Sequence, residues 1–279
     1  RDLHSFPTRR SSDLRFKHCW NRCEFCVSRM HHEDYGANII GEDNEIPTSY
    51  LNRIAFVREE GCNTMILTGT AEPQQNLNFI YNLLQANKTL SKPFYNIAIQ
   101  TTGSGLEEID IEELAKRGVT TMAISLNSLD DEENWEISNT PKILRTMTTK
   151  ELIVAAKKYG MNIRLCYNLT SAYNKYNFDY MMDYAVNNNV DQVTFRKIYT
   201  CGNSEIDKWI KAHAYDDYDF MLIKKCVTKY GKLIARLPYG FLQYSVNGVS
   251  VVVDDDCMAK DNIEESKIGR AVQQECRDR

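Results

Sequence analysis

Apolar and polar residues alternate in several short stretches of the chain, and longer amphipathic stretches lie between them. The alternating stretches cover residues 64–68, 96–102, 121–127, 162–168 and 192–198. The amphipathic stretches, which have helical spacing, cover residues 47–60, 75–88, 111–116, 149–159 and 176–188. Strands that alternate with helices in this way are typical of βα units, which build a parallel sheet. The pattern therefore predicts an α/β fold.

Glycines mark the ends of several predicted helices. Gly61 follows the first of them, and Gly118 and Gly160 follow two later ones. Glycine is favoured there because it adopts the left-handed conformation that ends a helix. Beyond residue 232 the alternation changes, and residues 233–237 and 249–254 are predicted as edge strands. We therefore expect a short C-terminal extension after the βα units.

The two faces of the predicted strands differ in character. Within residues 162–168, Ile163 and Leu165 lie on one face, and Arg164 and Cys166 lie on the other. Residues two apart in a strand share a face, so we expect the apolar face to pack against helices. A closed eight-stranded barrel fills its interior with branched apolar side chains, whereas here the opposite face is small or polar. This contrast predicts an open partial barrel, whose inner face lines a cavity for water or a ligand.

Both ends of the chain differ from the rest. Residues 1–14 and 267–279 resemble translated sequencing adaptor, so we exclude them from the predicted fold. The sequence does not begin with Met, and we expect an internal fragment of a longer protein whose first strand is truncated. The expected division is a barrel over residues 15–232 and a truncated C-terminal extension over residues 233–266.

Charge and cysteine content narrow the class of protein. The 279 residues carry a formal net charge of −4, and leaving out the two ends makes the balance more acidic. An acidic balance argues against a nucleic-acid substrate. No apolar run is long enough to span a membrane, and the scattered cysteines do not resemble a secreted disulfide scaffold. We therefore expect a cytoplasmic protein with no membrane segment.

Three cysteines stand close together near the start of the chain. They are Cys19, Cys23 and Cys26 in the run HCWNRCEFCVSR, and aromatic Phe25 precedes the last of them. Thiolates are soft ligands that suit iron–sulfur clusters and zinc. Three thiolates satisfy three irons of a four-iron cluster and leave the fourth iron open, whereas structural zinc normally needs four protein ligands. The spacing favours a reactive cluster, with a zinc site completed by His18 as the alternative.

A second motif lies at the end of the strand predicted over residues 64–68. Residues 67–73, LTGTAEP, resemble the Gly-x-Gly-Glu-Pro turn of the radical S-adenosylmethionine superfamily, and the cysteine spacing resembles the signature of the same superfamily. Gly69, Glu72 and Pro73 match the turn, while Ala71 stands where the family usually has its second glycine. The resemblance covers roughly residues 15 to 199.

The resemblance implies a partial (β/α)6 barrel with a parallel sheet, in which the three cysteines bind a [4Fe-4S] cluster. It also implies that the turn cradles the amino group of S-adenosylmethionine and that strand-end side chains hold the rest of this cofactor. The candidates for cofactor binding are Phe25, Gly69, Glu72, Pro73, Ser125, Asn127 and Arg196, with Thr102 and Asn168 beside them. Ser125 and Asn127 are also suited to capping the turn after their strand, and Arg196 to an acidic substrate or an internal salt bridge.

The chemistry that the resemblance implies is reductive. The open iron binds S-adenosylmethionine, an electron from the reduced cluster cleaves the sulfur–C5′ bond, and the resulting 5′-deoxyadenosyl radical abstracts a hydrogen atom from the substrate. The protein supplies positioning and excludes water. The family further implies oxygen sensitivity, a reducing partner such as ferredoxin or flavodoxin, and a small-molecule or peptide substrate.

Two other functions remain open from the sequence. One is a non-catalytic zinc or iron–sulfur scaffold, which requires neither the turn at residues 69–73 nor the polar inner face. The other, within the enzyme class, is an activase that makes a glycyl radical on a partner protein. Cys166 is a candidate hydrogen donor on the inner face, although a small apolar residue of the interior is its commoner role. The acidic run at residues 254–256 is predicted as a solvated turn.

Overall fold

The computed structural model describes residues 13–14, 18–30, 41, 43–200, 202, 204–237 and 241–254. In this part of the chain a nine-stranded sheet has the strand order β1-β2-β3-β4-β5-β6-β9-β8-β7. The strands are β1 (Asp13–Leu14), β2 (Thr64–Gly69), β3 (Asn96–Thr101), β4 (Thr121–Leu126), β5 (Asn162–Leu169), β6 (Gln192–Lys197), β7 (Lys232–Arg236), β8 (Leu242–Val246) and β9 (Val249–Asp254).

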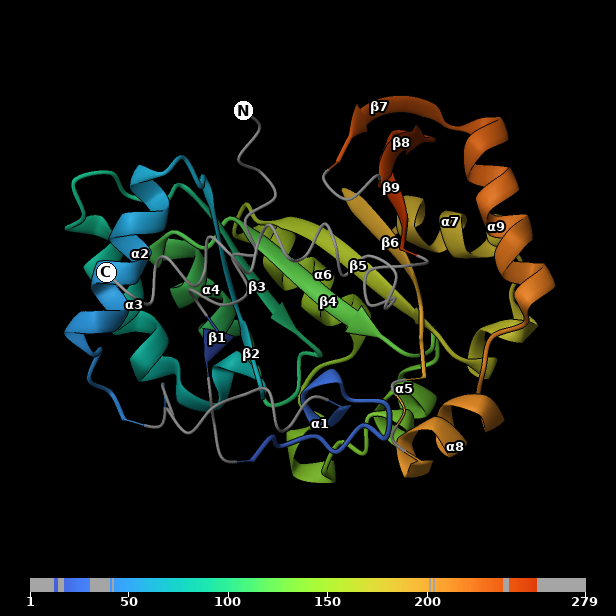
Figure 1. Ribbon diagram of the computed structural model, residues 1–279, viewed down its shortest axis with the longest axis horizontal. Helices are drawn as coiled ribbons and strands as arrows, with labels where there is room; N and C mark the ends of the chain where they lie inside the picture. The colour runs from blue at the N-terminus through green and yellow to red at the C-terminus, as the bar shows by residue number, and fades with distance from the viewer. Residues whose placement is uncertain are drawn as a thin grey trace.

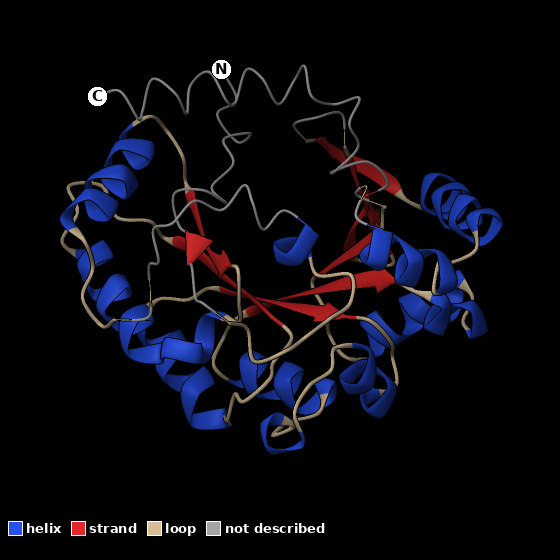
Figure 2. Ribbon diagram, turned by 60° about the horizontal axis from the view of Figure 1, so that its bottom comes forward, coloured by secondary structure: helices blue, strands red, loops and turns tan. Residues whose placement is uncertain are grey.

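Most of the helices cover the convex face of the curved sheet (Figure 2). The α-helices are α1 (Val27–Met30), α2 (Thr48–Glu59), α3 (Leu77–Lys88), α4 (Glu108–Arg117), α5 (Asp131–Ile137), α6 (Thr149–Lys158), α7 (Phe178–Asn187), α8 (Ser204–Ala212) and α9 (Asp217–Tyr230). Short 3-10 helices are η4 (Pro73–Asn76), η5 (Lys142–Leu144) and η6 (Ser171–Lys175). Figure 1 shows α2 and α3 beside one end of the sheet and α9 beside the other. This arrangement confirms the predicted α/β fold with a mostly parallel, barrel-like sheet.

The first six strands are parallel and pair in the order of the sequence. β9 then pairs with β6 in parallel, and β8 and β7 follow in antiparallel pairing. The prediction of an edge strand is therefore correct for β7 and wrong for β9, which lies between β6 and β8. At the other edge, Asp13 and Leu14 pair with Thr68 and Gly69. These two residues of the adaptor-like segment take the place expected for the truncated first strand.

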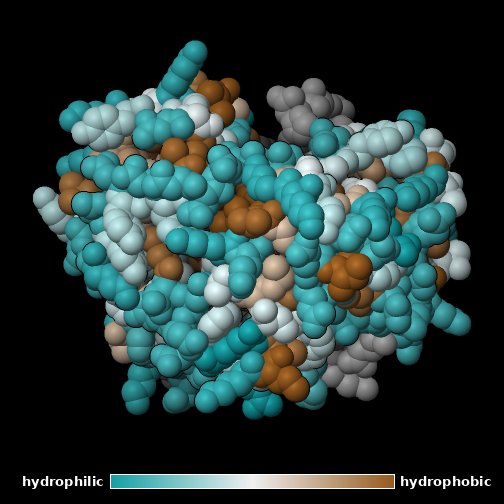
Figure 3. All heavy atoms as spheres, turned by 180° about the vertical axis from the view of Figure 1, so that it is seen from behind, coloured by the Kyte–Doolittle hydropathy of each residue, from teal (hydrophilic) through white to brown (hydrophobic). Residues whose placement is uncertain are grey.

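The faces of the central strands are separated as the alternation predicts. In β5, Ile163, Leu165 and Tyr167 are fully buried in the main hydrophobic core, while Arg164 on the opposite face is partly exposed. Burying an apolar side chain of this size stabilises the fold by roughly 1.5–3 kcal/mol. Cys166 shares the face of Arg164 but is only 3 % exposed. The molecular surface seen from behind is mostly hydrophilic, with apolar side chains in small groups (Figure 3).

The turn after β3 depends on a glycine that has no room for a side chain. Gly103 has a φ of 89°, and a Cβ placed on it would lie 2.3 Å from Leu152 Cδ1. Gly118, at the end of α4, has a similar φ of 109°, but a Cβ there would meet no heavy atom of the described residues within 4 Å. A side chain at either position would therefore strain the backbone, but only a side chain at Gly103 would also clash with a neighbour.

We expect Gly103→Ala to lower the free energy of unfolding by about 2–4 kcal/mol, and Gly118→Ala by about 1 kcal/mol. Urea denaturation of the two variants measures the difference. Equal losses would show that Leu152 moves aside without cost, and would contradict the tight packing of this turn.

Candidate functional site

Residues 18–26, which carry the three cysteines and are called the cysteine loop below, are held at the carboxyl ends of β3 and β4. Active sites are built at this end of a parallel sheet. Asn21 Nδ2 donates a hydrogen bond of 2.8 Å to Oγ1 of Thr102, directly after β3. The carbonyl of Ser138, directly after α5, accepts from the Arg22 N–H at 3.1 Å and from the Cys23 thiol at 3.6 Å. Figure 1 accordingly shows α1, which follows Cys26, on the same side of the molecule as α5 and α8.

Glu72 is the centre of a buried hydrogen-bond cluster that ties the cysteine loop to β3. Its side chain is 7 % exposed. The carboxylate accepts hydrogen bonds from Thr101 Oγ1 at 2.6 Å, from Gln74 Nε2 at 2.9 Å and from Thr102 Oγ1 at 2.9 Å. Asn21 Nδ2 also donates to it, at 3.2 Å. Because both carboxylate oxygens accept protein donors, Glu72 positions the loop, and the predicted contact of its side chain with a cofactor stays a prediction.

The turn before Glu72 has an ordinary backbone. Gly69 ends β2, and Pro73 is the first residue of η4, where its fixed φ suits a helix start. Neither Gly69 nor Ala71 has a positive φ. The Ala in place of the family's second glycine therefore causes no backbone strain. The turn leaves β2 at the same end of the sheet as the cysteine loop.

Gln75 joins this turn to the first residues of the cysteine loop. Its Oε1 accepts from the Trp20 N–H at 2.9 Å, and its Nε2 donates to the carbonyl of His18 at 2.9 Å. The structure thus fixes the backbone of His18, while the side chain of that residue is exposed. The role of His18 as a fourth zinc ligand stays an untested alternative.

Asn127 caps the turn after β4, which is the alternative role that its sequence position suggested. The side chain is 1 % exposed, its Nδ2 donates to Ser138 Oγ at 2.8 Å, and its Oδ1 accepts from Asn168 Nδ2 at 3.0 Å. The Asn127 N–H donates to Asn134 Oδ1 at 2.8 Å. Ser138 therefore links this cap to the cysteine loop. The predicted cofactor contacts of Asn127 and Asn168 are not tested by these bonds.

Ser125 and Arg196 lie on the inner face with different surroundings. Ser125 is in register with Cys166 and Thr194 and is partly exposed, and its side chain makes no hydrogen bond among the described residues. Its hydroxyl is free to meet a ligand. Arg196 Nε instead pairs with Asp254 Oδ2 at 3.0 Å, the internal salt bridge that was one alternative for this residue. Asp254 is 6 % exposed, so its prediction as part of a solvated turn is wrong.

The thiols of Cys19 and Cys23 are hard to ionise because burial raises the pKa of each. The pKa of Cys19 is raised to about 11, mainly by burial and further by the nearby Glu72 carboxylate. Burial also raises the pKa of Cys23, and the neighbouring charges of Cys26 and Glu72 raise it further. The charge of Cys26 thus acts on both Cys19 and Cys23, and the charge of Cys19 acts on Cys23. Thiolates in this setting are stable beside positive charge, such as that of bound iron.

The raised pKa of Cys19 predicts how the iron-free protein responds to alkali. Its value of about 11 lies above the ordinary 9.0, so the unfolded chain loses this proton first as the pH rises. The stability that Cys19 contributes is complete below pH 9 and declines between pH 9 and 11. We expect Cys19→Ala to remove part of this decline, measured as the free energy of unfolding in urea at several pH values. If the free energy of unfolding declines equally with pH in the parent and the variant, ionisation of Cys19 is not its cause.

The donor set fits an iron–sulfur cluster. It consists of soft thiols carried by one loop, as cluster ligation requires. Among the described residues, which include all three cysteines, no three His, Cys, Asp or Glu side chains are gathered closely enough to hold a metal ion, so the three thiols would have to move together to bind a cluster. Cys19, Cys23 and Cys26 are all partly accessible and form no disulfide.

The other cysteines stand apart from the loop. Cys62 is buried and its thiol donates to the carbonyl of Thr64 at 3.4 Å, which agrees with the structural role of a residue after a helix end. Cys226 is partly exposed on α9. Cys201, Cys257 and the remainder of the acidic run after Asp254 lie outside the described residues.

Several residues that build the site were not identified from the sequence. Asn21, Ser138 and Gln74 act through partners far away in the chain, and no local pattern marks them. Gln75 had a local signal, because Glu72 and Gln75 form a capping box, in which two residues three apart cap a helix start reciprocally. Trp209 was also not identified, although its ring centroid lies 5.3 Å from that of Phe25.

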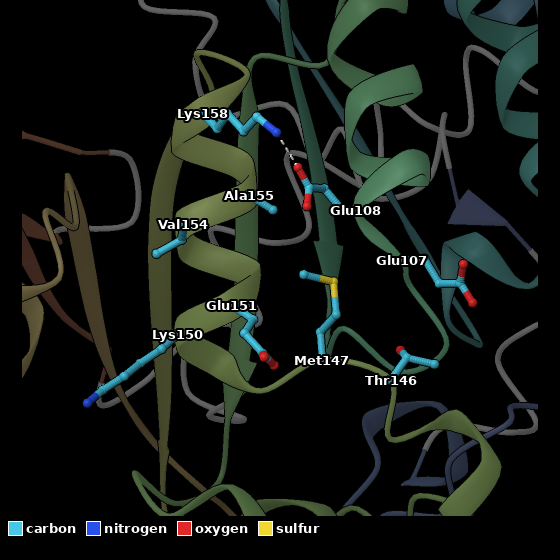
Figure 4. Close-up of a pocket in the computed structure, with 9 residues that line it drawn as sticks. All are labelled: Glu107, Glu108, Thr146, Met147, Lys150, Glu151, Val154, Ala155 and Lys158. Atoms are coloured by element: carbon cyan, nitrogen blue, oxygen red, sulfur yellow. Dashed lines mark hydrogen bonds and ion pairs between the residues drawn. The ribbon is translucent and has the colours of Figure 1, made fainter.

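A separate hollow of about 700 Å³ opens on the outer side of the sheet, between α4 and α6. Figure 4 shows Lys158 pointing across it toward Glu108, to which it is paired at 2.6 Å. The hollow is lined by none of the predicted site residues. Within the described part of the chain, no helix is both long and apolar enough to cross a lipid bilayer.

A family model matches more than half of the chain. The sequence model of the Radical SAM superfamily matches residues 15–185, which include the cysteine loop, the turn and strands β2 to β5. No curated protein matches the sequence.

Solved structures share the fold at low sequence identity. SuiB from Streptococcus suis, bound to precursor peptide SuiA, is 20 % identical with a TM-score of 0.53, covering 78 % of this chain and 44 % of that one. Native anSMEcpe with bound AdoMet is 16 % identical with a TM-score of 0.53, covering 78 % and 58 %. Coproporphyrinogen III oxidase (HemN) from Escherichia coli is 14 % identical with a TM-score of 0.51, covering 82 % and 56 %. The aligned part thus spans about half the length of these proteins.

Proposed function

The chain belongs to the radical SAM superfamily, and on this basis we propose that it is an enzyme that uses a [4Fe-4S] cluster to cleave S-adenosylmethionine and abstract a hydrogen atom from its substrate. The observation that carries the proposal is the position of the three cysteines within the family match. Their loop is fixed at the carboxyl ends of parallel strands, beside the turn that ends in Glu72 and Pro73.

The residues of the chain have separate tasks in this proposal. Cys19, Cys23 and Cys26 would hold the cluster, and the turn that contains Gly69 would lie against S-adenosylmethionine. Together these two groups, when bound, supply reductive radical chemistry that amino-acid side chains do not provide. Ser125 offers a hydroxyl on the inner face, and Phe25 offers an apolar ring beside the cysteines. The protein thus contributes positioning and the exclusion of water.

The substrate and the reducing partner are part of the proposal. A small molecule or a peptide is the substrate class that we propose, and the peptide class gains support from SuiB, which binds a precursor peptide. A ferredoxin or flavodoxin would deliver the electron, and we expect the loaded protein to be sensitive to oxygen. A cytoplasmic location suits such a protein, because the cytoplasm keeps thiols reduced.

Product analysis tests the proposed reaction. The chain would be loaded anaerobically with iron and sulfide, reduced with dithionite and mixed with S-adenosylmethionine. We expect 5′-deoxyadenosine and methionine to form only when both the loaded protein and the reductant are present. A folded, iron-loaded chain that forms neither product would contradict the proposal and favour a non-catalytic scaffold.

A further inference from the structure

The cysteine loop packs against α8, a helix that follows β6 far along the chain. The rings of Phe25 and Trp209 are stacked, with centroids 5.3 Å apart and an interplanar angle of 29°. Phe25, Ile206 and Ile210 are 9 %, 5 % and 4 % exposed and form a small apolar cluster separate from the main core. Cys23 and Trp209 pack against this cluster. The apolar side of the cysteine loop is therefore covered by α8.

Trp209 is itself held in place by a second aromatic contact. Its ring stacks on that of His213, with centroids 4.1 Å apart and an interplanar angle of 13°. His213 Nδ1 lies 2.9 Å from the carbonyl of Trp209, and the His213 carbonyl accepts from the Ser171 N–H at 2.9 Å. Ser171 begins η6, directly after β5. A stack of three rings thus connects the cysteine loop to the body of the barrel.

We propose that Trp209 is a positioning residue for the cluster. By stacking on Phe25, Trp209 keeps the segment from Cys23 to Cys26 closed. Phe25 lies between two of the thiols in sequence, so movement of its ring displaces both ligands. A stacked aromatic pair stabilises beyond what the area it buries contributes, enough to change the population of an open loop by up to about tenfold. The stack also keeps water from one side of the thiols. The role rests on the proposed function, although the stack is a property of the iron-free chain.

Hydrogen exchange of the iron-free chain tests the contact without any cluster chemistry. We expect Trp209→Ala to speed amide exchange over residues 19–30 by about tenfold, and Trp209→Phe, which keeps a ring, to restore nearly the parental rate. Tyr180→Ala is the matched control, because Tyr180 stacks on Tyr176 at 4.9 Å outside the cysteine loop. This control should leave exchange of the loop unchanged. If Trp209→Ala does not fold, Trp209→Leu keeps apolar bulk without a ring. In this variant, the amides of residues 19–30 should still exchange faster than in the control.

A second measurement separates this role from the proposed function. After loading with iron and sulfide, the parent and the Trp209→Phe chain should lose iron in air at similar rates, and the Trp209→Ala chain severalfold faster. A parent that forms a cluster, together with unchanged loop exchange and iron loss in folded Trp209→Ala, would overturn the role of Trp209 alone. A parent that forms no cluster would refute the proposed function, and this role with it.

Discussion

Replacing Cys23 by Ala is expected to abolish cluster binding while the chain remains folded. The variant removes one of only three thiols in the loop, and a four-iron cluster with two protein ligands is not retained. The fold tolerates the loss because Cys23 lies outside the main core and, among the described residues, its thiol makes one long hydrogen bond, of 3.6 Å to the carbonyl of Ser138. We expect a loss in the free energy of unfolding of about 1 kcal/mol. Iron analysis and visible absorption after anaerobic reconstitution measure the effect on the cluster.

Cys226→Ala is the matched control for this experiment. Cys226 is also partly exposed, but it lies on α9 and outside the cysteine loop. The control should take up as much iron as the parent and cleave S-adenosylmethionine at the same rate. Parental iron content in Cys23→Ala would contradict the assignment of the cluster ligands.

Replacing Glu72 by Gln is expected to destabilise the protein and to reduce iron loading together. The carboxylate accepts donors from Thr101, Thr102, Gln74 and Asn21, and an amide presents an N–H group to at least one of them. Hydrogen bonds to a buried charged group contribute about 1.5–3 kcal/mol, so we expect a loss of about 2–3 kcal/mol in the free energy of unfolding. Because Asn21 belongs to the cysteine loop, the same change should loosen the three thiols.

Urea denaturation measures the loss of stability, iron analysis after anaerobic reconstitution measures the loading, and hydrogen exchange of residues 19–30 measures the loosening of the loop. Glu108→Gln provides the control, because Glu108 makes an ion pair with Lys158 on the exposed surface. Pairs of this kind contribute little to stability. A Glu72→Gln chain with parental stability and parental exchange of the loop would show that the cluster around Glu72 does not hold the loop.

The strands of the barrel could be predicted because each buried strand carries its own signal. The five alternating stretches begin at the same residues as β2 to β6 and end within one residue of them. Their alternation predicts which face of each strand is buried, and this prediction requires no knowledge of distant parts of the chain. The helix predicted over residues 75–88 begins later, at Leu77, because Pro73–Asn76 forms η4. Helix α5 had no apolar period to find, since its buried residue is Asn134.

The part of the sheet formed by β7, β8 and β9 was predicted less well, for two reasons. The hairpin of β8 and β9 had a local signal that was not used, since Asn247 and Gly248 have φ values of 50° and 84° and Asn-Gly favours such turns. The parallel pairing of β9 with β6 has no local signal. It depends on how α8 and α9 return the chain to the sheet, and the charge pair of Arg196 and Asp254 becomes visible only after that return.

The candidate site was predicted as a set of motifs, and the structure adds the contacts that hold the motifs together. Cysteine spacing and the turn at residues 69–73 follow from chemistry that a short stretch can express. The bonds from Asn21 to Glu72 and from Ser138 to the loop join residues that are distant in sequence. Such contacts depend on the register of the parallel strands, so they could not be derived from local patterns.

Electron paramagnetic resonance of the anaerobically reconstituted chain tests the central claim most directly. Spectra would be recorded at low temperature after reduction, with and without S-adenosylmethionine. We expect the signal of a reduced four-iron cluster, and we expect it to change when S-adenosylmethionine is added, because three cysteine ligands would leave one iron open. A folded chain that binds zinc and gives no such signal would contradict the account.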